Sequence, residues 1–228
     1  MVNYQIRVYQ DSDYQSVRGL YVSGVRQHFP RVCRYVLKQP VIQASVIVSL
    51  SLLLVLCDSL LLFLFLLAVF LVLGRLLLKR LWDLLIDQNL RADLQDIWAS
   101  YSERPGACFW VAQRDGVVIG SVGAVPSDHS PTDLELKRLN VHREYRGQGI
   151  AKALCHTVHE FAHLSGFTGI VLGTSVIQTE AQQLYRKLGY RLVGTSPVPH
   201  TFAKLINYTI YKYRYQLRPS PDRPQTQE

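Results

Sequence analysis

A nearly continuous apolar run from Val41 to Leu78 limits what this chain of 228 residues can fold into. Within the run, Asp58 and Arg75 are the only ionic side chains. One straight crossing of a bilayer needs about 20 apolar residues, so the run is too long for a single perpendicular helix. It is also too long for a buried helix of a small domain. Two interpretations remain open: one long tilted helix with an overhang, or a hairpin that enters and leaves the membrane on one side.

Basic side chains flank this run at both ends. They are Arg31, Arg34 and Lys38 before it, and Arg75, Lys79 and Arg80 in its last turns or just after it. Positive charge marks the cytoplasmic side of a membrane segment, and each basic residue near the surface attracts anionic lipid by about 1 kcal/mol. Asp58 would cost roughly 2.5–3.5 kcal/mol at mid-bilayer, but at a hairpin tip it would reach headgroups or water. The flanks therefore favour a hairpin over residues 41–80, with the lipid bilayer as a partner.

The whole chain is basic, with 25 lysines and arginines against 17 acidic residues and a formal charge of +8. Such a balance fits nucleic acid, anionic lipid or an anionic cofactor. The basic residues gather beside the apolar run and beside a glycine-containing loop, not in an aromatic-basic stripe, so we expect no nucleic acid partner. The four cysteines form no C-x-x-C pair, which is typical of free thiols in a reducing compartment.

Outside the apolar run, the sequence predicts short strands and helices. Tyr4–Tyr9 alternates as a strand does, and Asp11 and Ser12 offer N-cap chemistry to a helix behind them. Leu84–Tyr101 is predicted to form a second helix. The later predicted strands are Cys108–Gln113, Val117–Val125, Leu134–Val141, Gly169–Thr174, Tyr190–Gly194 and Ala203–Tyr215, and the later predicted helices are Ile150–Ser165 and Glu180–Leu188.

Three further segments have the composition of turns or loops. Asp115-Gly116 supplies the positive φ values that a tight hairpin turn requires. Pro126–Asp133 is predicted to be a polar loop. The proline-rich, polar tail over residues 218–228 is predicted to be disordered.

The stretch RGQGIA, residues 146–151, joins the predicted strand that ends at Val141 to the helix that follows. Gly147 and Gly149 let the backbone approach a ligand closely, and the helix start presents unpaired N–H groups and a positive dipole end. With the charge of Arg146 beside them, these features suit a pyrophosphate. The alternative is a plain strand-to-helix connection. The loop has neither the G-x-G-x-x-G fingerprint nor the Gly-Lys-Ser/Thr of a P-loop.

These residues resemble the GCN5-related N-acetyltransferases. The loop is similar to that family's R/Q-x-x-G-x-G/A motif, Glu135–Val141 to its fourth strand, and Ala181–Tyr190 to its A-x-x-L-Y-x-K-x-G-F/Y signature. The resemblance covers about residues 4–214. It implies an α/β (α+β) acetyltransferase fold, in which a mixed, mainly antiparallel sheet is flanked by helices and a hydrophobic membrane hairpin is inserted. Residues 1–40 would form the first strand and helix, and 81–217 the core with the acetyl-CoA site.

Within that superfamily, the inserted run and stretches such as GACFWVA and GIAKAL resemble the camello group, the N-acetyltransferase 8 family. This resemblance implies a protein of the endoplasmic reticulum or Golgi membrane that acetylates cysteine S-conjugates or protein lysines, including those of histones. The group is also associated with cell movement in gastrulation. Both ends of the run must lie on one side of the membrane, and acetyl-CoA places the catalytic domain in the cytosol. An inactive membrane adaptor with the same fold is the remaining alternative.

The resemblance also implies roles for individual residues. Contacts to acetyl-CoA are implied for the backbone of Leu139 and Val141, for Arg146, Gly147, Gln148, Gly149, Ile150 and Ala151 around the pyrophosphate, and for Gln178, where the family often has asparagine. Tyr185 matches the general acid that protonates the departing thiolate, with a core tyrosine as the alternative. Glu135 is a candidate general base, with a strand-end surface carboxylate as the alternative and water or a histidine as substitutes.

A rival motif, H-E-x-x-H, occurs at His159–His163. On a helix this pattern can bind zinc through two imidazoles, with the glutamate as base. The sequence shows no matched third ligand, and the inward face of the predicted helix is already apolar, so the histidines fall on a solvated or partly exposed face. We therefore expect no metal.

Overall fold

The computed structural model of the protein describes residues 3–57, 59–198 and 201–217. In these residues one seven-stranded sheet has the order β1-β2-β3-β4-β5-β7-β6. The strands are β1 (Gln5–Val8), β2 (Cys108–Arg114), β3 (Val117–Ser127), β4 (Ser130–Val141), β5 (Gly169–Ser175), β6 (Arg191–Pro197) and β7 (Thr209–Gln216). β4 and β5 are parallel, and the other neighbouring pairs are antiparallel. The predicted mixed, mainly antiparallel sheet is confirmed.

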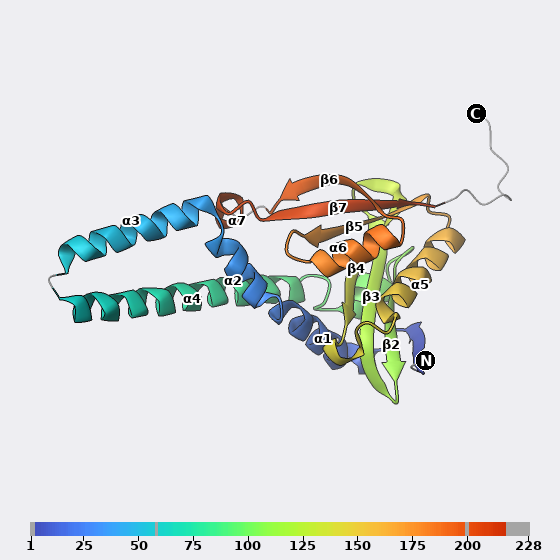
Figure 1. The fold of residues 1–228 in the computed structure, drawn as a ribbon. Coiled ribbons are helices and arrows are strands. Elements are labelled where there is room, and N and C mark those ends of the chain that lie inside the picture. Colours follow the sequence, from blue (N-terminus) through green and yellow to red (C-terminus); the bar gives the residue numbers. More distant parts are fainter. Residues whose placement is uncertain (1–2, 58, 199–200, 218–228) are drawn as a thin grey trace.

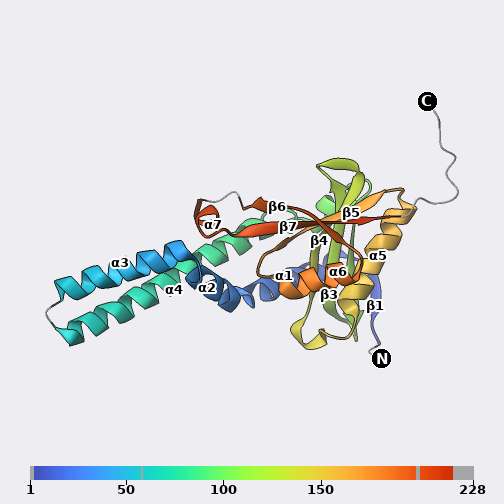
Figure 2. The same ribbon diagram turned by 45° about the horizontal axis from the view of Figure 1, so that its top comes forward.

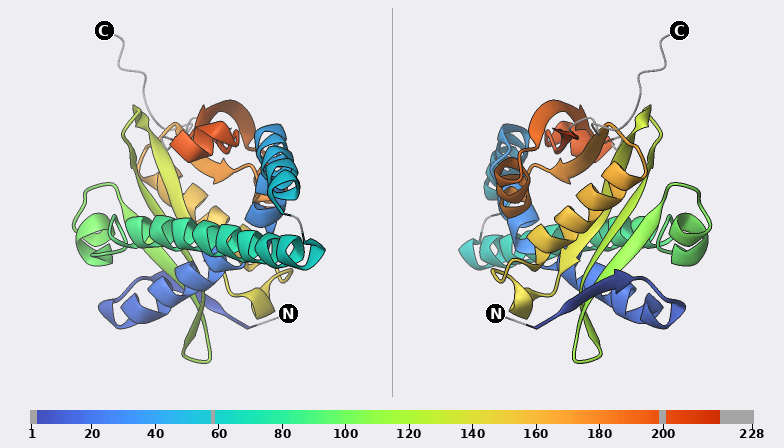
Figure 3. Two further views of the ribbon diagram at one scale, coloured as in Figure 1. Left: turned by 90° about the vertical axis from the view of Figure 1, so that its left-hand side faces the viewer. Right: turned by 90° about the vertical axis from the view of Figure 1, so that its right-hand side faces the viewer.

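Helices cover both faces of this sheet (Figure 3). Alternation along β2 separates the two cores, because Trp110 and Ala112 pack with α5 (Ile150–Leu164), whereas Phe109 and Val111 pack with α1 (Tyr14–Arg26). α6 (Thr179–Lys187) lies on the α5 side through Tyr185. The short helix η2 (Trp98–Ser102) lies on the α1 side through the buried Tyr101. An apolar core thus lies on each face of the sheet.

The apolar run forms two helices that lie side by side and project from one end of the sheet (Figures 1 and 2). They are α3 (Pro40–Leu56) and α4 (Leu60–Leu90), and α2 (Phe29–Leu37) precedes them. The backbone is extended at Cys57 and Ser59, where the chain reverses. This geometry is that of a hairpin and not of one long helix. Asp58, the predicted tip, lies outside the described residues.

The hairpin leaves its apolar side chains uncovered by the rest of the protein. Val55 and Leu61 expose 81% and 79% of their surface. By length and composition, α4 could cross a membrane, whereas α3 reaches a sufficient length only together with the preceding segment Asp11–Leu37, from which it is bent by 71°. One long apolar helix is compatible with membrane association.

The base of the hairpin is anchored to the sheet domain by a small apolar cluster. Val32 and Val36 of α2 pack with Ile177 and Ile206, and Leu78 and Trp82 of α4 join them. The Tyr35 hydroxyl donates a hydrogen bond to the Asn207 carbonyl oxygen at 2.7 Å. Because β1 and α1 also belong to the sheet domain, both ends of the hairpin meet the same body.

Three predicted elements are wrong in detail. The predicted helix Leu84–Tyr101 begins inside α4, which passes continuously through residues 80 and 81, and it is interrupted after Leu90. The Arg18 guanidinium donates to the carbonyl oxygens of Leu90 and Leu94, at 3.2 and 2.5 Å, so the chain turns there instead of extending the helix.

The second and third differences concern a strand and a loop. The predicted strand Ala203–Tyr215 begins with α7 (Thr201–Leu205), and its turn into β7 contains Asn207 at φ +51°. The predicted loop Pro126–Asp133 is a short β3–β4 turn, because both strands extend into it. The hairpin turn at Asp115-Gly116 is confirmed, with φ values of 49° and 80°. The predicted tail over residues 218–228 lies outside the described residues.

Candidate active site

The two parallel strands at the centre of the sheet separate along their length. β4 and β5 pair from Asp133↔Gly169 to Glu135↔Val171, and both strands continue beyond that point without further ladder pairs between them. A cavity of about 640 Å³ lies in the resulting wedge. It is lined by residues 135–140 of β4 and 173–175 of β5, with further residues from α1, α4 and α6. The wedge exposes backbone groups of both strands to a ligand.

A β-bulge interrupts β4 where it lines this cavity. Val122 of β3 lies opposite two residues, Arg138 and Leu139, since the register passes from Gly123↔Lys137 to Ser121↔Asn140. Arg138 has a φ of 56°, a left-handed value that is uncommon for a residue with a Cβ. A bulge frees backbone groups from the ladder and reorients them. The cavity wall therefore carries main-chain groups near Leu139 that can bind a ligand.

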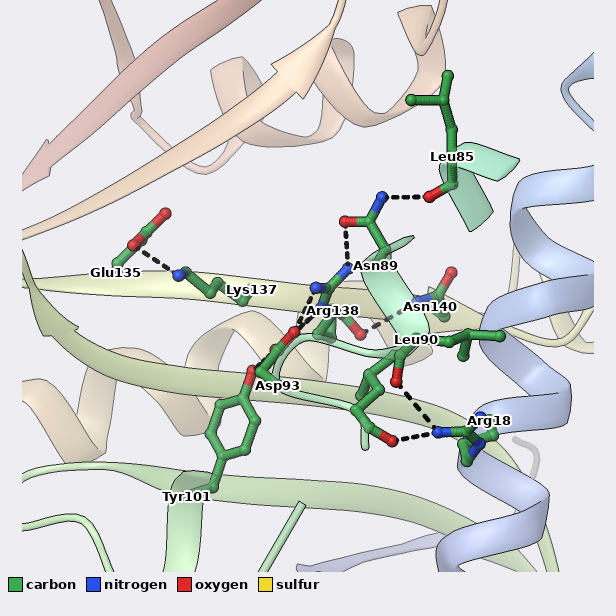
Figure 4. A network of polar contacts seen from close by, with 11 residues as sticks. Arg18, Leu85, Asn89, Leu90, Asp93, Tyr101, Glu135, Lys137, Arg138 and Asn140 are labelled. Atoms are coloured by element: carbon green, nitrogen blue, oxygen red, sulfur yellow. Dashed lines mark hydrogen bonds and ion pairs between the residues drawn. The ribbon is translucent and has the colours of Figure 1, made fainter. Parts of the chain in front are cut away.

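Glu135 lines the cavity at the point where the two strands part. Its side chain is about one-third exposed, and its Oε2 lies 3.1 Å from Nζ of Lys137, the next residue on the same side of β4 (Figure 4). Glu135 lies within β4, whereas the alternative of a surface carboxylate placed it at a strand end. A carboxylate there can accept a proton from a group bound in the cavity.

Tyr185 of α6 also lines this cavity. Its side chain is 6% exposed, and its ring packs against Tyr190 and Tyr213, with centroid distances of 5.6 and 6.2 Å. Burial, with a smaller contribution from Cys155, raises the pKa of Tyr185 above its ordinary range. The phenol therefore keeps its proton at physiological pH. Tyr185 therefore packs in the core and also lines the cavity.

The glycine loop lies between the end of β4 and the start of α5. Gly147 and Gly149 have φ values of 76° and 84°, and a Cβ on either would meet no atom within 4 Å. Gly149 is the N-cap of α5, whose first N–H groups have no partner within the helix. The space beside both glycines is therefore open, and unpaired donors face the loop end of the helix. This is a backbone cradle suited to a phosphate group.

The side chains of Arg146, Val141 and Ile150 all make contacts within the protein. The Arg146 Nε donates to the Val141 carbonyl oxygen at 3.0 Å, and Nη1 donates to Oε1 of Gln27, the C-cap of α1, at 2.9 Å. Val141 and Ile150 are 8% and 1% exposed, so their side chains belong to the core and leave only backbone groups for a ligand. The guanidinium thus closes the turn between β4 and the loop.

Gln178 lines the cavity from the N-terminus of α6. Its Oε1 accepts hydrogen bonds from the Thr174 hydroxyl at 3.1 Å and from the Ser175 N–H and hydroxyl, both at 3.0 Å. The oxygen therefore holds the β5–α6 turn together. The amide NH₂ is the part of the side chain that remains for a ligand.

The cavity brings together Glu135, Leu139, Gln178 and Tyr185, but the loop over residues 146–151 and Val141 lie outside its lining. β4 links the two regions, since the cavity follows that strand to Asn140 and the strand then leads into the loop. A ligand with an anionic part on the loop and a long polar arm would lie along β4.

Arg31 of α2 joins the base of the hairpin to α6. Its guanidinium makes a bidentate ion pair with the Glu180 carboxylate in the first turn of that helix. The hydrogen bond from Arg31 lowers the pKa of Glu180 to about 2, against the opposing effect of burial. Nearby His28 also lines the cavity, and its buried Nδ1 has no hydrogen-bond partner in the described part of the chain.

Several cavity residues were not identified from the sequence: His28, Trp82, Lys137, Arg138 and Tyr208. Arg138 carries the clearest overlooked signal, because a charged residue within a strand of a buried sheet requires a partner. That partner, Asp93, lies 45 positions away, which no local pattern reveals.

The rival histidine motif has a different explanation in the fold. His159 Nε2 lies 2.9 Å from the Tyr190 hydroxyl, and its imidazole stacks on Tyr215 with a centroid distance of 4.4 Å. No group of three potential metal-ligating side chains occurs among the residues that the structure describes. His159 is thus a packed histidine between α5 and the sheet.

Acidification should destabilise the fold through His159. Burial, with the charge of His156, lowers its pKa from 6.5 to about 4. Below about pH 6.5 the unfolded chain binds a proton that the folded chain does not, so this stability is full above pH 6.5 and is lost as the pH falls towards 4. Thermal melts should show a smaller acid-side loss for His159→Phe than for the wild type. Equal pH slopes in both proteins would contradict this assignment.

Known proteins match both the sequence and the fold. The model of the Acetyltransferase (GNAT) family matches residues 75–190. N-acetyltransferase 8B of Homo sapiens is 41% identical over 224 residues, which cover 95% of this chain and 96% of that protein. The probable N-acetyltransferase camello of Xenopus tropicalis is 35% identical over 218 residues, covering 96% and 100%.

Solved structures share the fold at low sequence identity. An acetyltransferase from Salmonella typhimurium, solved with its cofactor acetyl-CoA, superposes with a TM-score of 0.57 at 16% identity and covers 98% of this chain and 99% of that one. A GNAT-family acetyltransferase from Staphylococcus aureus Mu50 gives 0.56 at 20% identity, covering 92% and 99%. These two likenesses concern the fold alone.

Proposed function

Because this chain belongs to the GNAT acetyltransferase family, we propose that it is a membrane-bound enzyme whose acceptor is the α-amine of a cysteine S-conjugate or a similar small amphipathic amine. Membership in the family, and similarity to its N-acetyltransferase 8 and camello members, confirms the resemblance expected from the sequence. It makes the chain an N-acetyltransferase that uses acetyl-CoA. The acceptor, the membrane and the individual residue roles are the proposed parts.

The chain's own geometry fits acetyl-CoA. The open backbone cradle at Gly147 and Gly149 suits the pyrophosphate, with N–H groups over residues 146–151 as donors. Backbone groups of Leu139 and Val141 would pair with the pantetheine along β4, inside the wedge that β5 leaves open. The bulge near Leu139 would direct an N–H group at the acetyl carbonyl oxygen, where it stabilises developing negative charge.

Acetyl transfer forms a bond between the amine nitrogen and the carbonyl carbon and breaks the carbon–sulfur bond. Glu135, or a water that it holds, would take the proton that the amine loses. Tyr185 would give its proton to the leaving thiolate, because burial keeps the phenol protonated. The two side chains line one cavity and come from β4 and α6. A fall in kcat in Glu135→Gln, with acetyl-CoA binding kept, is the sign expected of the base.

The observation that carries the acceptor assignment is an apolar chamber beside this cavity. The chamber has about 400 Å³ and lies at the base of the hairpin. Its lining is Val32, Leu78, Leu81, Trp82, Leu84, Leu85, Gln88, Val198, Ala203, Ile206 and Tyr208. Trp82, Leu85, Val198 and Tyr208 line the catalytic cavity too, so the two spaces adjoin.

This pairing of spaces suits an acceptor with an amine at one end and an apolar group at the other. The amine would enter the cavity near Glu135, and the apolar group would occupy the chamber, where burial of its surface contributes about 25 cal/mol per Å². A carboxylate on the acceptor would also suit a basic protein. A lysine side chain in a peptide has no comparable apolar extension beyond its amine.

An assay of S-benzylcysteine against a lysine peptide tests this function. We expect acetyl-CoA-dependent transfer to S-benzylcysteine, and Ala203→Phe, which fills the chamber, should raise its KM about tenfold without changing the KM for acetyl-CoA. Val193→Phe, at a residue of β6 that is 59% exposed, is the matched control. Transfer to the peptide alone would favour a protein lysine acetyltransferase, and transfer to neither would favour an inactive adaptor.

The membrane placement rests on the hairpin. The apolar part of α4, residues 60–78, is about 28 Å long, close to the roughly 30 Å of a bilayer core. With basic residues at both ends of the hairpin, the sheet domain would lie on the cytosolic face of the endoplasmic reticulum or Golgi. Protection of residues 81–217 from protease in sealed microsomes would contradict this orientation.

A further inference from the structure

Arg138 connects the bulge of β4 to the segment that follows α4 (Figure 4). Its Nε donates to Oδ1 and Oδ2 of Asp93 at 3.1 and 3.0 Å, and Nη2 donates to Oδ1 as well. Nη1 donates to Oδ1 of Asn89, in the last turn of α4, at 3.3 Å. The guanidinium also stacks over the ring of Tyr21 in α1, 5.0 Å from its centroid. The side chain is therefore held on several sides.

The acidic partner is fixed as firmly as the arginine. Asp93 also accepts a hydrogen bond from the buried Tyr101 hydroxyl, and Asn89 Nδ2 donates to the Leu85 carbonyl oxygen at 2.8 Å. Side-chain exposures are 15% for Arg138 and 21% for Asp93. A largely buried, bidentate pair of this kind has a defined geometry, unlike an exposed ion pair.

The backbone of the bulge is held on its other side by two further hydrogen bonds. The Arg138 carbonyl oxygen accepts from the Ser121 hydroxyl at 3.3 Å and from Nδ2 of Asn140 at 3.2 Å. A left-handed φ at a residue with a Cβ persists only where its surroundings enforce it. Here the enforcing contacts come from β3, from β4 and, through the side chain, from the end of α4 and the segment that follows it.

We propose that Arg138 is a positioning residue for acetyl transfer: its clamp to Asp93 and Asn89 sets the bulge that aims the Leu139 region at the acetyl carbonyl. The end of α4 and the segment after it then help to position the active site, in addition to joining the hairpin to the sheet domain. This inference rests on the proposed function, because the bulge matters only if acetyl-CoA lies along β4.

Arg138→Lys tests the clamp in the full-length, detergent-solubilised protein. Lysine keeps the charge but loses the fork that binds Asp93 bidentately. We expect kcat to fall roughly 10- to 100-fold, the range of a weakened oxyanion contact, with the calorimetric Kd for acetyl-CoA changed less than about threefold. Asp93→Asn should behave in the same way, because it weakens the same pair from the other side.

The matched control is a second bidentate pair, whose two residues do not line the cavity. Arg7 Nη1 and Nη2 bind Oδ2 and Oδ1 of Asp13 at 2.7 and 2.8 Å, with side-chain exposures of 21% and 6%. Asp13→Asn should lower the melting temperature comparably and leave kcat unchanged. If Arg138→Lys lowers kcat no more than Asp13→Asn does, Arg138 is merely structural and the proposal is wrong.

Amide hydrogen exchange gives a readout that does not depend on the acceptor. In the wild type, acetyl-CoA should slow exchange at Leu139, and in Arg138→Lys this protection should be reduced at least several-fold. Equal protection in both proteins would overturn the positioning role. Protection without any acetyl transfer by the wild type would instead refute the proposed function and leave the clamp supported.

Discussion

Gly149→Glu should abolish measurable binding of acetyl-CoA. Gly149 has a φ of 84°, and a side chain at such a φ costs roughly 1–2 kcal/mol. The larger effect is electrostatic, because the new carboxylate would lie at the N-terminus of α5, where the pyrophosphate is expected, and would repel it. We expect the calorimetric Kd to rise by at least 100-fold, and the stabilisation by acetyl-CoA in thermal melts to disappear.

Gly116→Glu is the matched control for this change. Gly116 has a φ of 80°, and a Cβ there also meets no atom within 4 Å, so strain and added charge are alike. It lies in the β2–β3 turn, outside the loop and cavity. Both variants should lose similar melting temperature without ligand, while Gly116→Glu keeps acetyl-CoA binding. If Gly149→Glu binds acetyl-CoA as the wild type does, the loop is only a connection between β4 and α5.

Local patterns predicted the parts of the site that are adjacent in sequence. Most of β4, the two glycines and the first turns of α5 follow one another within the 22 residues from Leu134 to Cys155. Their geometry depends on turn chemistry and helix ends, which short-range rules describe well. The hairpin was predictable for a similar reason, since its charges flank one apolar run and its two ends must reach one domain.

Contacts between distant segments were not predictable. The Arg138–Asp93 pair, the bulge that it accompanies and the chamber built from α2, α4 and α7 each join residues far apart in the chain. The predicted helix Leu84–Tyr101 failed for the same reason. Its sequence suits a helix, but Arg18 binds the carbonyl oxygens of Leu90 and Leu94, and Asp93 turns towards β4. Tertiary contacts overrode local propensity there.

Tyr185→Phe should lower kcat by about 100-fold at saturating acetyl-CoA, the lower range for loss of a general acid. The KM for acetyl-CoA should change little, because the ring remains and its packing against Tyr190 and Tyr213 is kept. Since burial raises the pKa of Tyr185, the wild-type phenol stays protonated on the alkaline side. Deprotonation of Tyr185 should therefore not lower the kcat of the wild type as the pH rises above neutral. Steady-state rates with S-benzylcysteine over that pH range measure both effects.

Tyr213→Phe is the matched control, because it removes a hydroxyl from the same aromatic group. Tyr213 is fully buried, and its hydroxyl has no hydrogen-bond partner in the portion of the chain that the structure describes. Removing that hydroxyl should leave kcat unchanged and the melting temperature unchanged or slightly raised, since an unpaired buried polar group is costly. Tyr185→Phe with undiminished kcat would assign its hydroxyl to the core. A drop of equal size in both variants would show that the packing of the aromatic group, and not proton donation, sets the rate.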